Sequence, residues 1–182
     1  MFATIPNLLT VLRIILVPFI AYTLLYRLWM LAFPLFAIAA VSDALDGYLA
    51  RKWDQKTKIG AYLDPLADKL LIVSCYAVLA FAPVEGLHIP GWFLSIVLVK
   101  ELILLMGVLY WGIVKQEVEV RPSILGKAAM FVQSILVGWV IACSIFHWMP
   151  IKTFHLVLAI ALLLIIASLV HYSYTLYCET HE

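Results

Sequence analysis

Four aspartates stand in two closely spaced pairs inside sequence that is otherwise strongly apolar. Asp43 and Asp46 are three residues apart, which places them on one face of a helix. Asp64 and Asp68 are four residues apart and share a helix face in the same way. An aspartate at the centre of a bilayer costs about 2.5–3.5 kcal/mol. Ionisable residues in such segments are therefore candidates for a functional site.

The chemistry open to four clustered carboxylates follows from their charge. They repel one another unless some are protonated or cations neutralise them. Oxygen ligands suit Mg²⁺, Mn²⁺ or Ca²⁺, and two such ions suit an in-line phosphoryl displacement. The alternative is structural: Arg51, Lys52 and Lys69 lie close enough in sequence to form salt bridges with these aspartates.

Small residues and one arginine lie between the two acidic pairs. Gly47, Ala50 and Gly60 leave space either for a flat ligand or for close helix packing. Arg51 has a planar guanidinium that can bind two phosphate oxygens at once. The segment therefore combines candidate metal ligands with candidate phosphate and ligand contacts.

The composition indicates that these residues sit in a membrane. Of the 182 residues, 65% are hydrophobic and 13% charged, whereas soluble domains have about 45–50% and about 25%. The mean hydropathy is +1.06. This composition excludes a soluble enzyme, a disordered regulator and a DNA-binding domain, and the net charge of +1 gives no reason to expect nucleic acid as a partner. The three cysteines are scattered in apolar runs and predict neither disulfides nor a metal site.

Six segments are long and apolar enough to cross a bilayer about 30 Å thick. They predict an all-α integral membrane protein with six transmembrane helices, and residues 1–182 as a single membrane domain. The expected helices are 7–25, 29–49, 60–83, 91–113, 124–146 and 152–177.

The distribution of basic residues predicts the orientation. With six spans, the two termini and the second and fourth loops share one side, and most loop lysines and arginines lie there. The opposite side has only Arg27 and Lys152 in its loops. Both termini and the acidic pairs are therefore expected on the cytoplasmic side, in the inner membrane of a bacterium.

The spacing of these residues resembles the signature of the CDP-alcohol phosphotransferase family. The chain matches D-x-x-D-G-x-x-A-R-x8-G-x-x-x-D-x-x-x-D at every defined position, from Asp43 to Asp68. The segment Ile5-Pro6-Asn7-Leu8-Leu9-Thr10 with Arg13-Ile14, and Leu125-Gly126-Lys127, are similar to the bacterial phosphatidylglycerophosphate synthases of that family.

The resemblance implies transfer of the phosphatidyl group of CDP-diacylglycerol to glycerol 3-phosphate, with release of CMP, in phospholipid biosynthesis. It implies two divalent cations, Mg²⁺ or Mn²⁺, held by Asp43, Asp46, Asp64 and Asp68, with Asp68 also acting as general base. It further implies a homodimer. The residues expected to bind CDP-diacylglycerol are Gly47, Ala50, Arg51, Gly60, Asn7 and Thr10.

The acceptor is less clearly specified. A phosphorylated acceptor needs cationic partners, for which the candidates are Arg13, Lys69, Lys100, Arg121 and Lys127. The chain has Lys100-Glu101 where phosphatidylglycerophosphate synthases commonly carry Arg-Glu, and it lacks their further arginine in the fourth helix. Arg121-Pro122-Ser123 is also similar to the cardiolipin synthases of the superfamily, which use phosphatidylglycerol. Other acceptor alcohols remain open.

A cation channel or transporter is the alternative from a different class, because acidic clusters in membranes also mark ion paths. That interpretation accounts for the four carboxylates. It gives no reason for Gly47, Ala50, Arg51 and Gly60 at their spacing. We therefore predict an enzyme.

Overall fold

The computed structural model describes residues 5–52, 58–82, 84, 87–114 and 124–180, and side chains for 8–43, 63, 66–82, 84, 87–107 and 124–174. Within these ranges the chain forms six α-helices and one isolated β-bridge, which confirms the all-α prediction. They are α1 (Ile5–Leu25), α2 (Trp29–Lys52), α3 (Lys58–Phe81), α4 (Gly91–Val114), α5 (Ile124–Ile145) and α6 (Ile151–Thr180).

The expected and observed helix ends differ by a few residues. The predicted third helix extends to residue 83, whereas α3 ends at Phe81. Pro83 follows, and proline disfavours helical geometry in the residue before it. The last helix is longer than predicted, because α6 continues to Thr180.

Three of the described segments are long and apolar enough to cross a membrane: Leu8–Leu25, Ile124–Ile145 and Ile151–Tyr174. A shorter apolar stretch covers Trp29–Asp43 of α2. Asp43 is also the last residue of α2 whose side chain is described. The helical, membrane-type character of the chain is therefore confirmed, and three of the six predicted spans are supported within the described residues.

Contacts along the backbone divide the chain into two compact units. The first contains Met1–Gly91 and Val137–Met149, and so holds α1, α2, α3 and the last part of α5. The second contains Trp92–Leu136 and Pro150–Glu182, and so holds nearly all of α4, the first part of α5 and α6.

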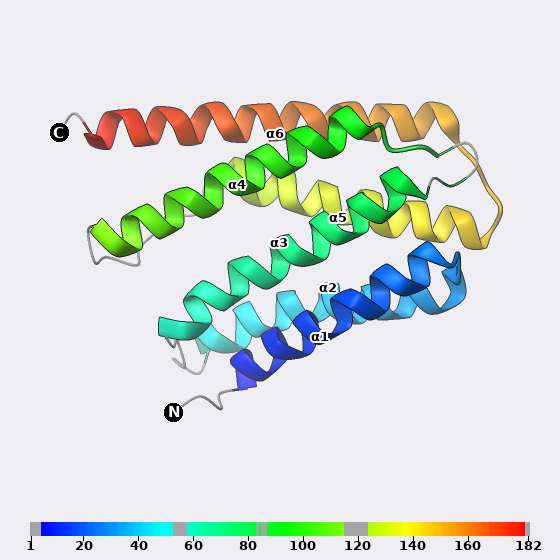
Figure 1. Cartoon of the computed structure of the whole chain (residues 1–182), viewed down its shortest axis with the longest axis horizontal. Helices are drawn as coiled ribbons and strands as arrows, with labels where there is room; N and C mark the ends of the chain where they lie inside the picture. The colour runs from blue at the N-terminus through cyan, green and yellow to red at the C-terminus, as the bar shows by residue number, and fades with distance from the viewer. Residues whose placement is uncertain (1–4, 53–57, 83, 85–86, 115–123, 181–182) are drawn as a thin grey trace. The chain divides into compact units, whose positions relative to one another are not determined.

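In the first unit, α1 packs against both α2 and α3 (Figure 1). The chain reverses after α1 at Arg27, which has a left-handed φ of 58°. There the Leu28 amide donates to the Thr23 carbonyl at 2.8 Å, which caps the last turn of α1. This reversal sends α2 back along α1.

The core of the first unit has small residues where the helices approach one another. Ala32 and Ala39 of α2 and Ala67 of α3 are fully buried. A Cβ added to Gly138 would lie 3.4 Å from the ring of Phe36. Small side chains let helix backbones come close, and this brings polar groups on neighbouring helices within reach of one another.

Candidate active site

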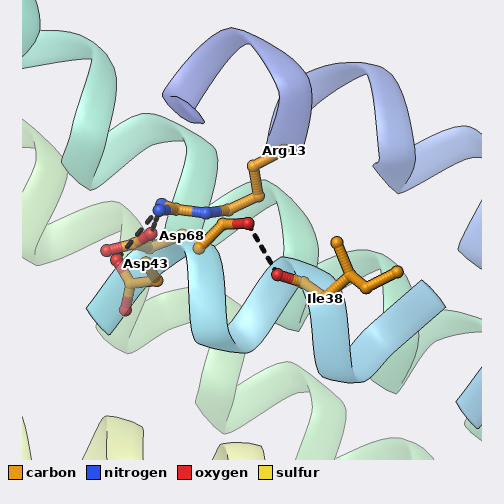
Figure 2. A network of polar contacts seen from close by, with 5 residues as sticks. Arg13, Ile38, Asp43 and Asp68 are labelled. Atoms are coloured by element: carbon orange, nitrogen blue, oxygen red, sulfur yellow. Dashed lines mark hydrogen bonds and ion pairs between the residues drawn. The ribbon is translucent and has the colours of Figure 1, made fainter. Parts of the chain in front are cut away.

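The centre of the candidate site is a buried arginine on α1. The Arg13 side chain has no exposed surface. Its Nη1 atom lies 3.2 Å from Asp43 Oδ1 of α2, and it also forms an ion pair and hydrogen bond with Asp68 Oδ1 of α3. Figure 2 shows the two carboxylates converging on the end of the guanidinium. One cation therefore connects three helices.

The two carboxylates are more open than the arginine that they contact. The Asp43 side chain is 49% exposed and the Asp68 side chain 20% exposed, whereas that of Arg13 is 0% exposed. The guanidinium is thus enclosed, whereas both carboxylates keep some exposed surface.

Neighbouring polar residues support this arrangement locally. Ser42, the residue before Asp43, donates its hydroxyl hydrogen to the Ile38 carbonyl at 2.7 Å, so its polar group is satisfied within α2 (Figure 2). Thr10 is fully buried three residues before Arg13, on the same face of α1. Lys69 follows Asp68 on α3 and is partly buried.

Several predicted site residues lie outside the side chains that the structure describes. Asp46 lies within α2 and Asp64 within α3, each one helical turn from a described aspartate. Arg121 lies outside the described residues altogether. The others lie within described helices but without described side chains: Asn7, Gly47, Ala50, Arg51 and Gly60.

The donor set at this site fits a hard divalent cation. Asp43 and Asp68 reach the same nitrogen atom from two different helices, so their oxygens lie close together. Carboxylate oxygens are the ligands that Mg²⁺ and Mn²⁺ prefer. Among the described side chains no group of three or more His, Cys, Asp or Glu residues occurs. Asp46 and Asp64, the other two aspartates of the predicted set, are not among the described side chains.

A second buried charge lies in the other unit. Lys100 of α4 is fully buried, and its Nζ lies 2.6 Å from Glu101 Oε1. The same Nζ donates to Gln133 Oε1 of α5 at 3.2 Å. Lys127, a further candidate for the acceptor phosphate, is exposed on α5.

Neither set of partners was predicted from the sequence. Arg13 and Lys100 were expected to contact an acceptor phosphate, and the structure gives both of them carboxylate partners from the chain itself. Gln133 was not singled out either. The signal for Gln133 was present, because an amide in the apolar sequence of α5 needs a polar partner.

The fold and the site together define a helical membrane protein with a carboxylate site built on its first three helices. The family model for CDP-alcohol phosphatidyltransferase matches residues 3–178. The chain belongs to this family.

Curated relatives carry two different names. The CDP-diacylglycerol–glycerol-3-phosphate 3-phosphatidyltransferase of Salmonella choleraesuis (strain SC-B67) is 31% identical over 144 residues, which is 75% of this chain and 76% of that protein. The protein of the same name from Cereibacter sphaeroides is 53% identical over 74 residues, which is 38% of this chain and 34% of that protein. The cardiolipin synthase (CMP-forming) of Rattus norvegicus is 32% identical over 161 residues, which is 80% of this chain and 52% of that protein.

The coverage of these relatives is uneven. The chain spans about half the length of the rat relative and about a third of the Cereibacter relative. It spans 31% of a probable cardiolipin synthase from Drosophila melanogaster. Similarity to both groups supports the family, and the acceptor has to be argued separately.

Proposed function

We propose that this chain transfers the phosphatidyl group of CDP-diacylglycerol to glycerol 3-phosphate, forming phosphatidylglycerophosphate and releasing CMP. The observation that carries the proposal is the convergence of Asp43 and Asp68 from two helices on one point, inside the region matched by the family. The relatives named CDP-diacylglycerol–glycerol-3-phosphate 3-phosphatidyltransferase support the donor and the acceptor.

The reaction exchanges one P–O bond for another. The acceptor hydroxyl oxygen attacks the phosphorus of the phosphatidyl group, and the bond from that phosphorus to the oxygen of CMP breaks. The hydroxyl proton goes to the Asp68 carboxylate, whose side chain is 20% exposed. We favour direct transfer, because the sequence offers no Ser/His or Cys/His pair for a covalent intermediate.

The four aspartates are proposed as the metal ligands. When bound, two divalent ions, Mg²⁺ or Mn²⁺, supply the positive charge that stabilises the diphosphate as CMP leaves. Asp43 and Asp68 meet the geometric requirement, because they approach from different helices. Asp46 and Asp64 lie one turn away along the same helices.

The remaining side chains of the signature are proposed to hold the donor. Gly47, Ala50 and Gly60 border the cytidine, and Arg51 binds the diphosphate. Asn7 and Thr10 contribute from α1, where Thr10 shares the face of Arg13. The acceptor phosphate is assigned to the other cations of the predicted set, Lys69, Arg121 and Lys127. Lys100 is not included, because its charge is enclosed with Glu101 and Gln133.

The membrane arrangement is part of the proposal. Six transmembrane helices form a single domain with both termini in the cytoplasm, and the site faces the cytoplasm from the inner membrane of a bacterium. The excess of basic residues in the loops on that side supports this orientation. A site at the membrane boundary receives the lipid donor from the bilayer and the soluble acceptor from water. By analogy with its family, the enzyme is a homodimer.

A cardiolipin synthase of the CMP-forming type is the second candidate. The relatives from rat and Drosophila, and the replacement of the expected Arg-Glu by Lys100-Glu101, favour it. Its donor and metal site are the same, and its acceptor is phosphatidylglycerol. The family match gives no support to a cation channel.

The test is CMP release by the purified full chain in detergent with CDP-diacylglycerol and Mg²⁺. Glycerol 3-phosphate, phosphatidylglycerol, inositol phosphate and serine are supplied one at a time. Release that depends on glycerol 3-phosphate is the expected result. Release with phosphatidylglycerol alone would replace the first candidate with the second. No release with any acceptor from folded protein, across several divalent metals, would overturn both.

A further inference from the structure

Arg13 is unusual because its charge is enclosed while its partners are not. A fully buried guanidinium is stable only when its charge is neutralised. Asp43 and Asp68 neutralise the guanidinium, although they are 30 and 55 residues away from Arg13 in the sequence. The interaction therefore joins α1 to two other helices rather than stabilising one helix locally.

The same carboxylate oxygens are the proposed ligands of the divalent cation. Asp43 Oδ1 and Asp68 Oδ1 both contact the Arg13 Nη1 atom. A cation that takes these oxygens as ligands must compete with the guanidinium for their lone pairs. It must also enter next to a fixed positive charge. Both effects weaken the binding of a metal ion relative to the same carboxylates without the arginine.

We propose that Arg13 is an internal counter-cation: it holds Asp43 and Asp68 together while no metal is bound, and it lowers the affinity of the site for a divalent cation. This inference rests on the proposed function, because it takes the two aspartates as metal ligands. It adds a role for Arg13 that differs from contact with the acceptor phosphate. Arg13 is a positioning residue here, since it acts through the two carboxylates.

The chemical nature of the side chain fits this role. An arginine stays charged under all ordinary conditions and offers several donors in one plane, so it can contact two carboxylates at once. Its buried position encloses the guanidinium beside the carboxylates, so the arginine joins the three helices that carry them.

Arg27 provides a control arginine just beyond the end of α1. It follows the last turn of α1 and its side chain is exposed, whereas that of Arg13 is buried. Arg13→Gln and Arg27→Gln remove the same charge and leave side chains of the same kind. Only the first change removes a contact with the carboxylates.

The experiment measures Mn²⁺ binding and thermal unfolding of the full chain in detergent after removal of metals with a chelator. We expect Arg13→Gln to tighten the Kd for Mn²⁺ by about tenfold or more. We expect it to lower the Tm in chelator by more than it does in saturating Mn²⁺, because a tighter ligand adds more stability to the folded state. Arg27→Gln should leave the Kd within about twofold of the wild type, since its charge lies far from the site along α1.

The failures of the two proposals are distinguishable. Wild-type protein that binds Mn²⁺, together with an Arg13→Gln variant of equal or weaker affinity, would overturn the role of Arg13 and leave the proposed function intact. Wild-type protein that binds neither Mn²⁺ nor Mg²⁺ would overturn the metal site itself, and this inference with it.

A second variant covers the case in which Arg13→Gln does not fold. Arg13→Lys keeps the charge but presents a single ammonium group in place of the planar donors. It should tighten Mn²⁺ binding by about threefold, because a lysine engages two carboxylates less well. An unchanged or weaker affinity in folded Arg13→Lys would contradict the proposal.

Discussion

Two buried cations, one in each unit, are neutralised in different ways. Arg13 takes its partners from two other helices, Asp43 of α2 and Asp68 of α3. Lys100 takes its carboxylate from the next residue, Glu101, and adds the amide of Gln133. Both cations have no exposed surface.

The exposure of the carboxylates separates the two clusters further. The Glu101 side chain is 7% exposed, whereas those of Asp43 and Asp68 are 49% and 20% exposed. Glu101 is thus enclosed together with Lys100, as expected for a neutralised pair inside a helix bundle. Asp43 and Asp68 remain open to an incoming ion or substrate. The first unit therefore holds an ion-pair cluster with partly exposed carboxylates, and the second holds an enclosed ion pair.

The largest expected effect on stability comes from breaking the enclosed pair. Lys100→Met leaves the Glu101 carboxylate buried without its cation, which should lower the free energy of unfolding by about 3–5 kcal/mol. The double change Lys100→Met with Glu101→Gln removes both charges and should cost at most about 1 kcal/mol. Reversible unfolding in mixed micelles measures both variants. Equal losses of unfolding free energy in the single and double variants would show that the unpaired Glu101 charge is not the cause of the destabilisation.

A smaller effect is expected where the second unit depends on shape rather than charge. A Cβ added to Gly107 of α4 would lie 1.4 Å from the Tyr172 hydroxyl oxygen of α6. Gly107→Ala must therefore displace the Tyr172 ring, at a cost of roughly 1–3 kcal/mol. The same unfolding assay checks it. In a Tyr172→Leu background the cost should largely disappear, and a cost that persists would contradict the close contact.

The smallest effect concerns Arg27, an exposed arginine of the first unit. Arg27 has a φ of 58°, a conformation that glycine adopts without strain. Arg27→Gly should therefore stabilise the protein slightly, by roughly 0.5–1 kcal/mol. The Tm in detergent is the measurement. A clear loss of stability would show that relief of backbone strain at this position is outweighed by the loss of the arginine side chain.

The helices were largely predictable from the sequence, and the four-aspartate site stays a prediction from it. Long apolar segments separated by charges, prolines and glycines define helix positions to within a few residues. The i, i+3 and i, i+4 spacing of the aspartates places each pair on one helix face. These patterns are local in the sequence, so they can be interpreted without knowing how the helices pack.

The partner of Arg13 was harder to predict because it depends on packing between helices. Helix lengths carry part of the information. From Arg13 to the end of α1 at Leu25 is about 18 Å, and from the start of α2 at Trp29 to Asp43 is about 21 Å. The two residues are therefore at similar depth in a pair of antiparallel helices. The rotation of each helix about its axis decides whether they meet, and the sequence does not specify it.

The proposed transfer depends on the carboxylates of the first unit. Its most direct test compares CMP release by Asp68→Asn and Glu101→Gln, each normalised to folded protein and assayed with CDP-diacylglycerol, Mg²⁺ and glycerol 3-phosphate. Both variants change a buried or partly buried carboxylate to an amide, one in each unit. We predict that Asp68→Asn lowers CMP release by roughly 10²–10⁴-fold, since it removes the proposed base, and that Glu101→Gln retains it to within a few fold. Near wild-type CMP release by folded Asp68→Asn would show that Asp68 is not the base of the transfer.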